Sequence, residues 1–81
     1  MPELSEISRY YRVSRHDLAY LKFIVEAYEG LATLSTVERE SGTVVVTYSS
    51  HFAEDVTNLM DALGTEIAIQ EVPGMEVYPH A

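Results

Sequence analysis

The chain has 81 residues with 13 acidic and 5 basic side chains, so its formal net charge is −8. This length makes one small domain, and the negative charge disfavours nucleic acid and anionic membrane surfaces as partners. The sequence has no cysteine, which excludes thiolate chemistry and cysteine-ligated metal sites and is consistent with a reducing cytoplasm. We therefore expect a single cytoplasmic domain with no signal peptide and no membrane-spanning segment.

The expected folded core covers residues 9–72, between a flexible N-terminus at 1–7 and a tail at 73–81. Gly30 and Gly64 are expected to end two helices, and Gly42 closes the turn of a β-hairpin. In chain order the expected elements are a strand over 9–14, a helix over 15–29, strands over 31–39 and 43–48, a helix over 51–63 and a strand over 67–72.

This β-α-β-β-α-β order is that of the split-βαβ, ferredoxin-like plan of the α+β class. Right-handed crossovers predict a four-stranded antiparallel sheet with strand order 4-1-3-2 and both helices on one face. The RNA-recognition motif shares this order, but where its third strand carries base-stacking aromatic residues after a glycine, Gly42 is followed here by Thr43-Val44-Val45-Val46. We therefore expect no nucleic-acid partner.

The first helix is apolar over more of its circumference than a helix on a sheet needs. The surplus is centred on Tyr20, Phe23 and Ala27. An uncovered apolar surface of this kind indicates a contact with another protein. We expect these three residues to form the interface of a homodimer or higher homo-oligomer, or to bind another protein partner. The alternative is that the apolar tail residues fold back over this surface.

A second candidate site lies where the first strand meets the first helix. Ser14, Arg15 and His16 stand at a helix N-terminus, where backbone N–H groups attract anions, and four of the five basic residues lie between positions 9 and 22. These residues could bind an anion or a small ligand. The alternative is that Ser14 caps the helix and Arg15 offsets nearby acidic loops.

We expect no metal and no cofactor. His16 and His51 stand at the starts of the two helices, which the expected fold puts at opposite ends of the sheet, so they cannot share a metal ion.

The stretch over residues 17–36, with its AYLKFI and YEGLA segments, resembles a family of short bacterial proteins classed as a domain of unknown function. The resemblance covers roughly residues 10–65. It implies a bacterial source and carries over no catalytic residue. Residues 17–31 also resemble the helix–glycine–strand segment of ACT-type regulatory domains, which bind amino acids between subunits.

We therefore expect a non-catalytic oligomerising or protein-interaction module with an ACT-like regulatory role, not an enzyme. The alternative is a small-molecule or anion-binding domain that uses the first strand-to-helix loop.

Overall fold

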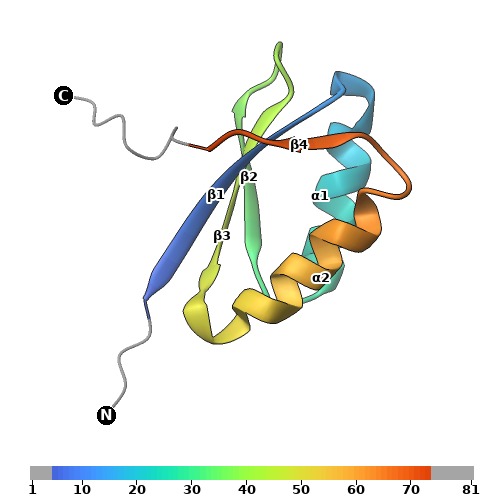
Figure 1. The fold of residues 1–81 in the computed structure, drawn as a ribbon. Coiled ribbons are helices and arrows are strands. Elements are labelled where there is room, and N and C mark those ends of the chain that lie inside the picture. The colour runs from blue at the N-terminus through green and yellow to red at the C-terminus, as the bar shows by residue number, and fades with distance from the viewer. Residues whose placement is uncertain (1–4, 74–81) are drawn as a thin grey trace, which may run out of the picture.

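The computed structural model describes residues 5–73, which form one sheet and two helices (Figure 1). The sheet has the order β2-β3-β1-β4, and each neighbouring pair is antiparallel. This is the predicted order 4-1-3-2 counted from the opposite edge, so the ferredoxin-like prediction is confirmed. The elements in chain order are β1 (Glu6–Val13), η1 (Arg15–Asp17), α1 (Leu18–Ala27), β2 (Thr33–Glu38), β3 (Thr43–Ser49), η2 (Ser50–Phe52), α2 (Ala53–Leu63) and β4 (Ile69–Glu71).

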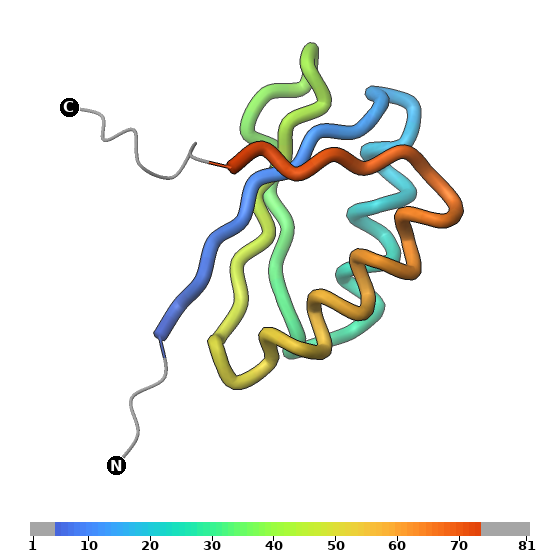
Figure 2. The backbone as a smooth tube through the Cα atoms, in the orientation of Figure 1, coloured from blue at the N-terminus to red at the C-terminus, as the bar shows by residue number. Residues whose placement is uncertain are grey.

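The core lies between the sheet and the two helices, which cover the same face of the sheet (Figures 1 and 2). Alternate residues of the central strands point into it, because successive side chains of a strand face opposite ways. Each helix supplies residues spaced three or four apart. The buried apolar residues are Tyr11, Val13, Leu21, Val25, Leu34, Val44, Val46, Tyr48, Val56, Met60 and Leu63.

On β2 and β3, the other face of the sheet carries small polar and β-branched side chains. Thr33 of β2 pairs with Thr47 of β3, and Ser35 pairs with Val45. These residues alternate with the buried ones, so they lie on the face away from the helices.

The first strand begins earlier than the sequence predicted. The prediction of a flexible segment over residues 1–7 is wrong for Glu6 and Ile7, because β1 starts at Glu6 and pairs along β3. The N–H of Ser5 donates to Ser50 Oγ at 3.1 Å, and the N–H of Ser50 donates to the Ser5 carbonyl at 2.7 Å. These bonds hold the start of β1 against the end of β3. Residues 1–4 and most of the expected tail, 74–81, lie outside the described residues.

Both helices begin with a short 3₁₀ turn, which the sequence did not predict. Ser14 Oγ accepts the N–H of His16 and Ser49 Oγ accepts the N–H of His51, each at 3.2 Å. Each serine caps a 3₁₀ turn, and the α-helix follows three residues later.

Two glycines adopt the left-handed backbone conformation. Gly30, with φ of 84°, follows the end of α1 at Ala27, and Gly42, with φ of 73°, ends the β2–β3 turn. Gly42 also packs against β1, because the N–H of Val13 donates to its carbonyl at 2.9 Å. A Cβ at Gly42 would lie 1.7 Å from the Val13 carbonyl oxygen, so only glycine fits there.

Candidate functional site

The outward side of α1 carries the apolar residues that the sequence singled out. Phe23 is 69% exposed and Tyr20 is 40% exposed, and Ala27 is exposed as well. Their spacing of three and four residues puts the three side chains on one side of the helix. We call this surface the α1 outer face. The structure therefore brings the three predicted interface residues together and leaves them uncovered by residues 5–73.

The flanks of the α1 outer face are polar, and on one of them the two charges balance. Lys22 Nζ lies 2.9 Å from Glu26 Oε2, one helical turn further on. At the N-terminal end, the hydroxyl of Tyr20 donates to Glu66 in the loop after α2. This hydrogen bond raises the pKa of Tyr20 above its usual value, because it stabilises the protonated hydroxyl.

The first strand-to-helix loop is exposed, and the side chains of Ser14 and Arg15 already have partners. Ser14 Oγ accepts the His16 N–H, and Arg15 Nη1 lies 3.4 Å from Glu40 Oε1. Ser14, Arg15 and His16 are therefore neighbours, as predicted. This geometry matches the alternative, in which Ser14 caps the helix and Arg15 offsets an acidic loop.

A polar cluster lies at the edge of the core, beside β4. Arg9 Nη1 lies 2.8 Å from Glu71 Oε2, and Arg9 Nε donates to the Tyr48 hydroxyl at 3.2 Å. These two hydrogen bonds raise the pKa of Arg9 above its usual value. Burial, reinforced by the charge of Glu71, raises the pKa of Tyr11 to about 12. The cluster joins β1, β3 and β4 and has an evident structural role.

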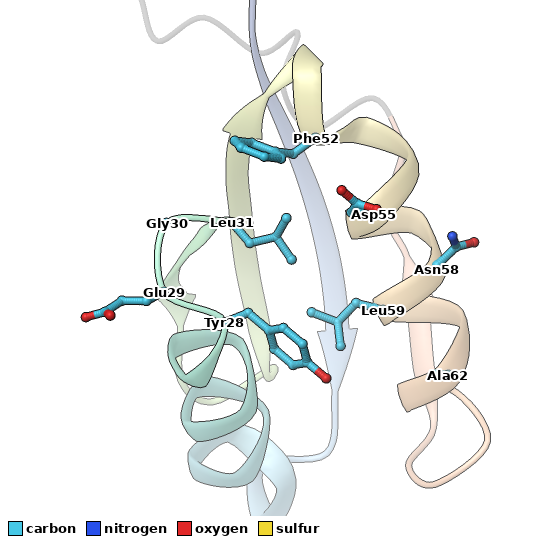
Figure 3. Close-up of a pocket in the computed structure, with 9 residues that line it drawn as sticks. All are labelled: Tyr28, Glu29, Gly30, Leu31, Phe52, Asp55, Asn58, Leu59 and Ala62. Atoms are coloured by element: carbon cyan, nitrogen blue, oxygen red, sulfur yellow. The ribbon is translucent and has the colours of Figure 1, made fainter.

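A groove opens between the end of α1 and the length of α2 (Figure 3). Its volume is about 720 Å³, within the range of small-molecule sites. Tyr28, Leu31 and Leu59 point into the space between the two helices, and Asp55 stands on the α2 side (Figure 3). The lining residues are Tyr28, Glu29, Gly30, Leu31, Phe52, Asp55, Asn58, Leu59 and Ala62.

Sequence reasoning did not find this groove. The helical period identified Tyr28, Phe52 and Leu59 as apolar, and it assigned them to the faces that pack on the core. The structure leaves Tyr28 51% exposed, where it lines the groove instead of packing into the core. Helical periodicity predicts the direction of a side chain, and the spacing between two helices depends on contacts distant in sequence.

Within the described part of the chain, no group of three or more His, Asp or Glu side chains could hold a metal ion. Over the same residues, neither helix has the length and apolarity needed to cross a membrane.

Comparison with known proteins supports the resemblance noted in the sequence. No curated protein and no solved structure matches the chain. One family model matches residues 11–67, which include β1 from Tyr11, both helices and the β2–β3 hairpin. This match spans more than half of the chain and confirms the predicted resemblance over roughly residues 10–65. The chain belongs to the family described as Domain of unknown function (DUF4911).

Proposed function

We propose that the protein is a non-catalytic interaction module that binds a second copy of itself through the α1 outer face. The observation that carries the proposal is the exposure of Phe23, at 69% of its surface. Moving a phenylalanine side chain out of water is favourable by about 1.5–3 kcal/mol. Tyr20 and Ala27 extend the same apolar surface along the helix, so a partner would bury all three together.

The charge distribution supports a second copy as the partner. With a net charge of −8, two copies repel each other unless they meet at a locally neutral surface. Helix α1 is neutral, since its only charged residues are Lys22 and Glu26. Two α1 helices packed antiparallel about a two-fold axis would bring Lys22 of each copy near Glu26 of the other.

The same proposal includes an ACT-like regulatory role. A ligand that binds near the helices would shift the balance between free and associated copies of the chain. We also propose a cytoplasmic location, which the absence of cysteine from the sequence supports.

Sedimentation velocity tests the proposed self-association. We expect the wild-type chain to sediment as a dimer or larger species at high micromolar concentration, and the Phe23→Glu variant to sediment as a monomer. Val37→Glu is the matched control, because Val37 is also an exposed apolar residue, at 47%, but lies on β2 and not on α1. We expect it to associate as the wild type does.

Circular dichroism shows whether each variant keeps its fold. We expect both variants to fold, because both positions are exposed. A monomeric wild-type chain at high micromolar concentration would refute the proposal. Equal dissociation of the Phe23 and Val37 variants would refute the assignment to α1.

A further inference from the structure

The groove between α1 and α2 has the features of a small-molecule site. Its floor is apolar, and Leu31, Phe52 and Leu59 are partly buried against the core. Tyr28, just after α1, and Leu59 of α2 point toward one another across it (Figure 3). An apolar body placed between them would contact both helices and the start of the β2 segment.

The charge around the groove is negative. Two of its lining residues, Glu29 and Asp55, are acidic, and none of them is basic. Asp55 lies on the α2 rim, whereas the carboxylate of Glu29 is directed away from the groove (Figure 3). The groove meets both the C-terminal end of α1 and the first turn of α2, so the two helix dipoles oppose each other there and the carboxylates set the sign of the charge.

From this geometry we propose that the groove binds a small amphiphilic amine. Its aromatic or branched aliphatic body lies between Tyr28, Leu31 and Leu59, and its ammonium group lies beside Asp55. The acidic rim disfavours an anionic ligand such as a fatty acid or a nucleotide. This site lies beside the α1 outer face, and the proposal does not depend on self-association.

Fluorescence titration with two dyes tests the proposed charge selectivity. Dansylcadaverine carries an aromatic body and a primary ammonium, and 1-anilinonaphthalene-8-sulfonate carries an aromatic body and a negative charge. We expect the full chain to bind dansylcadaverine more tightly than the sulfonate. Tighter or equal binding of the sulfonate would overturn the proposal.

Three variants locate the site. Asp55→Asn is expected to weaken dansylcadaverine binding by about two- to fivefold, the size of a solvent-exposed ion pair. Asp61→Asn makes the same charge change on the same helix, at a residue that does not line the groove, and is expected to leave binding unchanged. Tyr28→Ala removes one wall at an exposed position and is expected to weaken binding of both dyes. Equal effects of the Asp55 and Asp61 variants would overturn the proposal.

The Phe23→Glu variant separates this proposal from that of self-association. If the groove is a ligand site, the variant still binds dansylcadaverine and still prefers it to the sulfonate, whatever its oligomeric state. If dansylcadaverine binds only to this variant, a second copy occupies the groove in the wild type and the ligand proposal is wrong.

Discussion

The two left-handed glycines provide a matched pair of substitutions that tests the packing of the β2–β3 turn on β1. Gly30 and Gly42 have similar backbone angles, with φ of 84° and 73°. Alanine costs about 1–2 kcal/mol in this conformation. A Cβ at Gly30 meets nothing within 4 Å, whereas at Gly42 it would lie 1.7 Å from the Val13 carbonyl oxygen and 2.9 Å from its carbon.

This difference in contacts at the two glycines determines how much unfolding free energy each substitution is expected to cost. We expect Gly30→Ala to lower the free energy of unfolding by about 1 kcal/mol, because only the backbone conformation is penalised and alanine also restricts the unfolded chain. At Gly42 the backbone must move, which breaks the hydrogen bond from Val13 N–H, worth about 1 kcal/mol. The total loss for Gly42→Ala is then at least about 2 kcal/mol.

Urea unfolding followed by far-UV circular dichroism measures both losses. A chain of this length has a total stability of about 4–12 kcal/mol, so Gly42→Ala is expected to unfold at a much lower urea concentration than Gly30→Ala. Equal midpoints for the two variants would show that the turn does not pack on Val13, and would refute this reasoning.

Three other predictions concern the core and the polar cluster. Leu21→Ala is expected to lower the free energy of unfolding by about 2–5 kcal/mol in urea titrations, because Leu21 is fully buried; a loss below about 1 kcal/mol would contradict its place in the core. Since the pKa of Tyr11 is raised from 10.0 to about 12, its contribution to stability is complete below pH 10 and is lost as the pH rises through about 12. An absorbance titration should show a tyrosine that titrates near pH 12 and that disappears in Tyr11→Phe. Glu71→Gln is expected to cost only about 0.2–1 kcal/mol, because its ion pair with Arg9 is half exposed; thermal unfolding that shows a larger loss would mean that the cluster is coupled to the core.

The strand order was predictable because each element carries its own local pattern. The Thr43-Val44-Val45-Val46 run predicts a central strand through its β-branched residues. Gly30 and Gly42 mark the helix stop and the turn, and the structure gives both a positive φ. The surplus apolar residues of α1 were also predictable from the helical period.

The start of β1 was not predictable in the same way. Ile7 of β1 pairs with Tyr48 of β3. This contact between residues far apart in the sequence orders a segment that has no periodicity of its own. The groove was missed for a related reason, since its existence depends on how α1 and α2 are placed relative to each other in the assembled fold. Local patterns indicate which side chains are apolar, and only the assembled fold shows which of them stay uncovered.

A concentration series of amide NMR spectra tests the central claim, self-association through α1, most directly. Resonances of residues at an interface shift as the protein is diluted, and those elsewhere stay in place. We predict shifts concentrated on the α1 outer face, at Tyr20, Phe23 and Ala27, with none at Ser35 and Thr47 on the opposite face of the sheet. Shifts confined to that opposite face, or no shifts up to high micromolar concentration, would contradict the account.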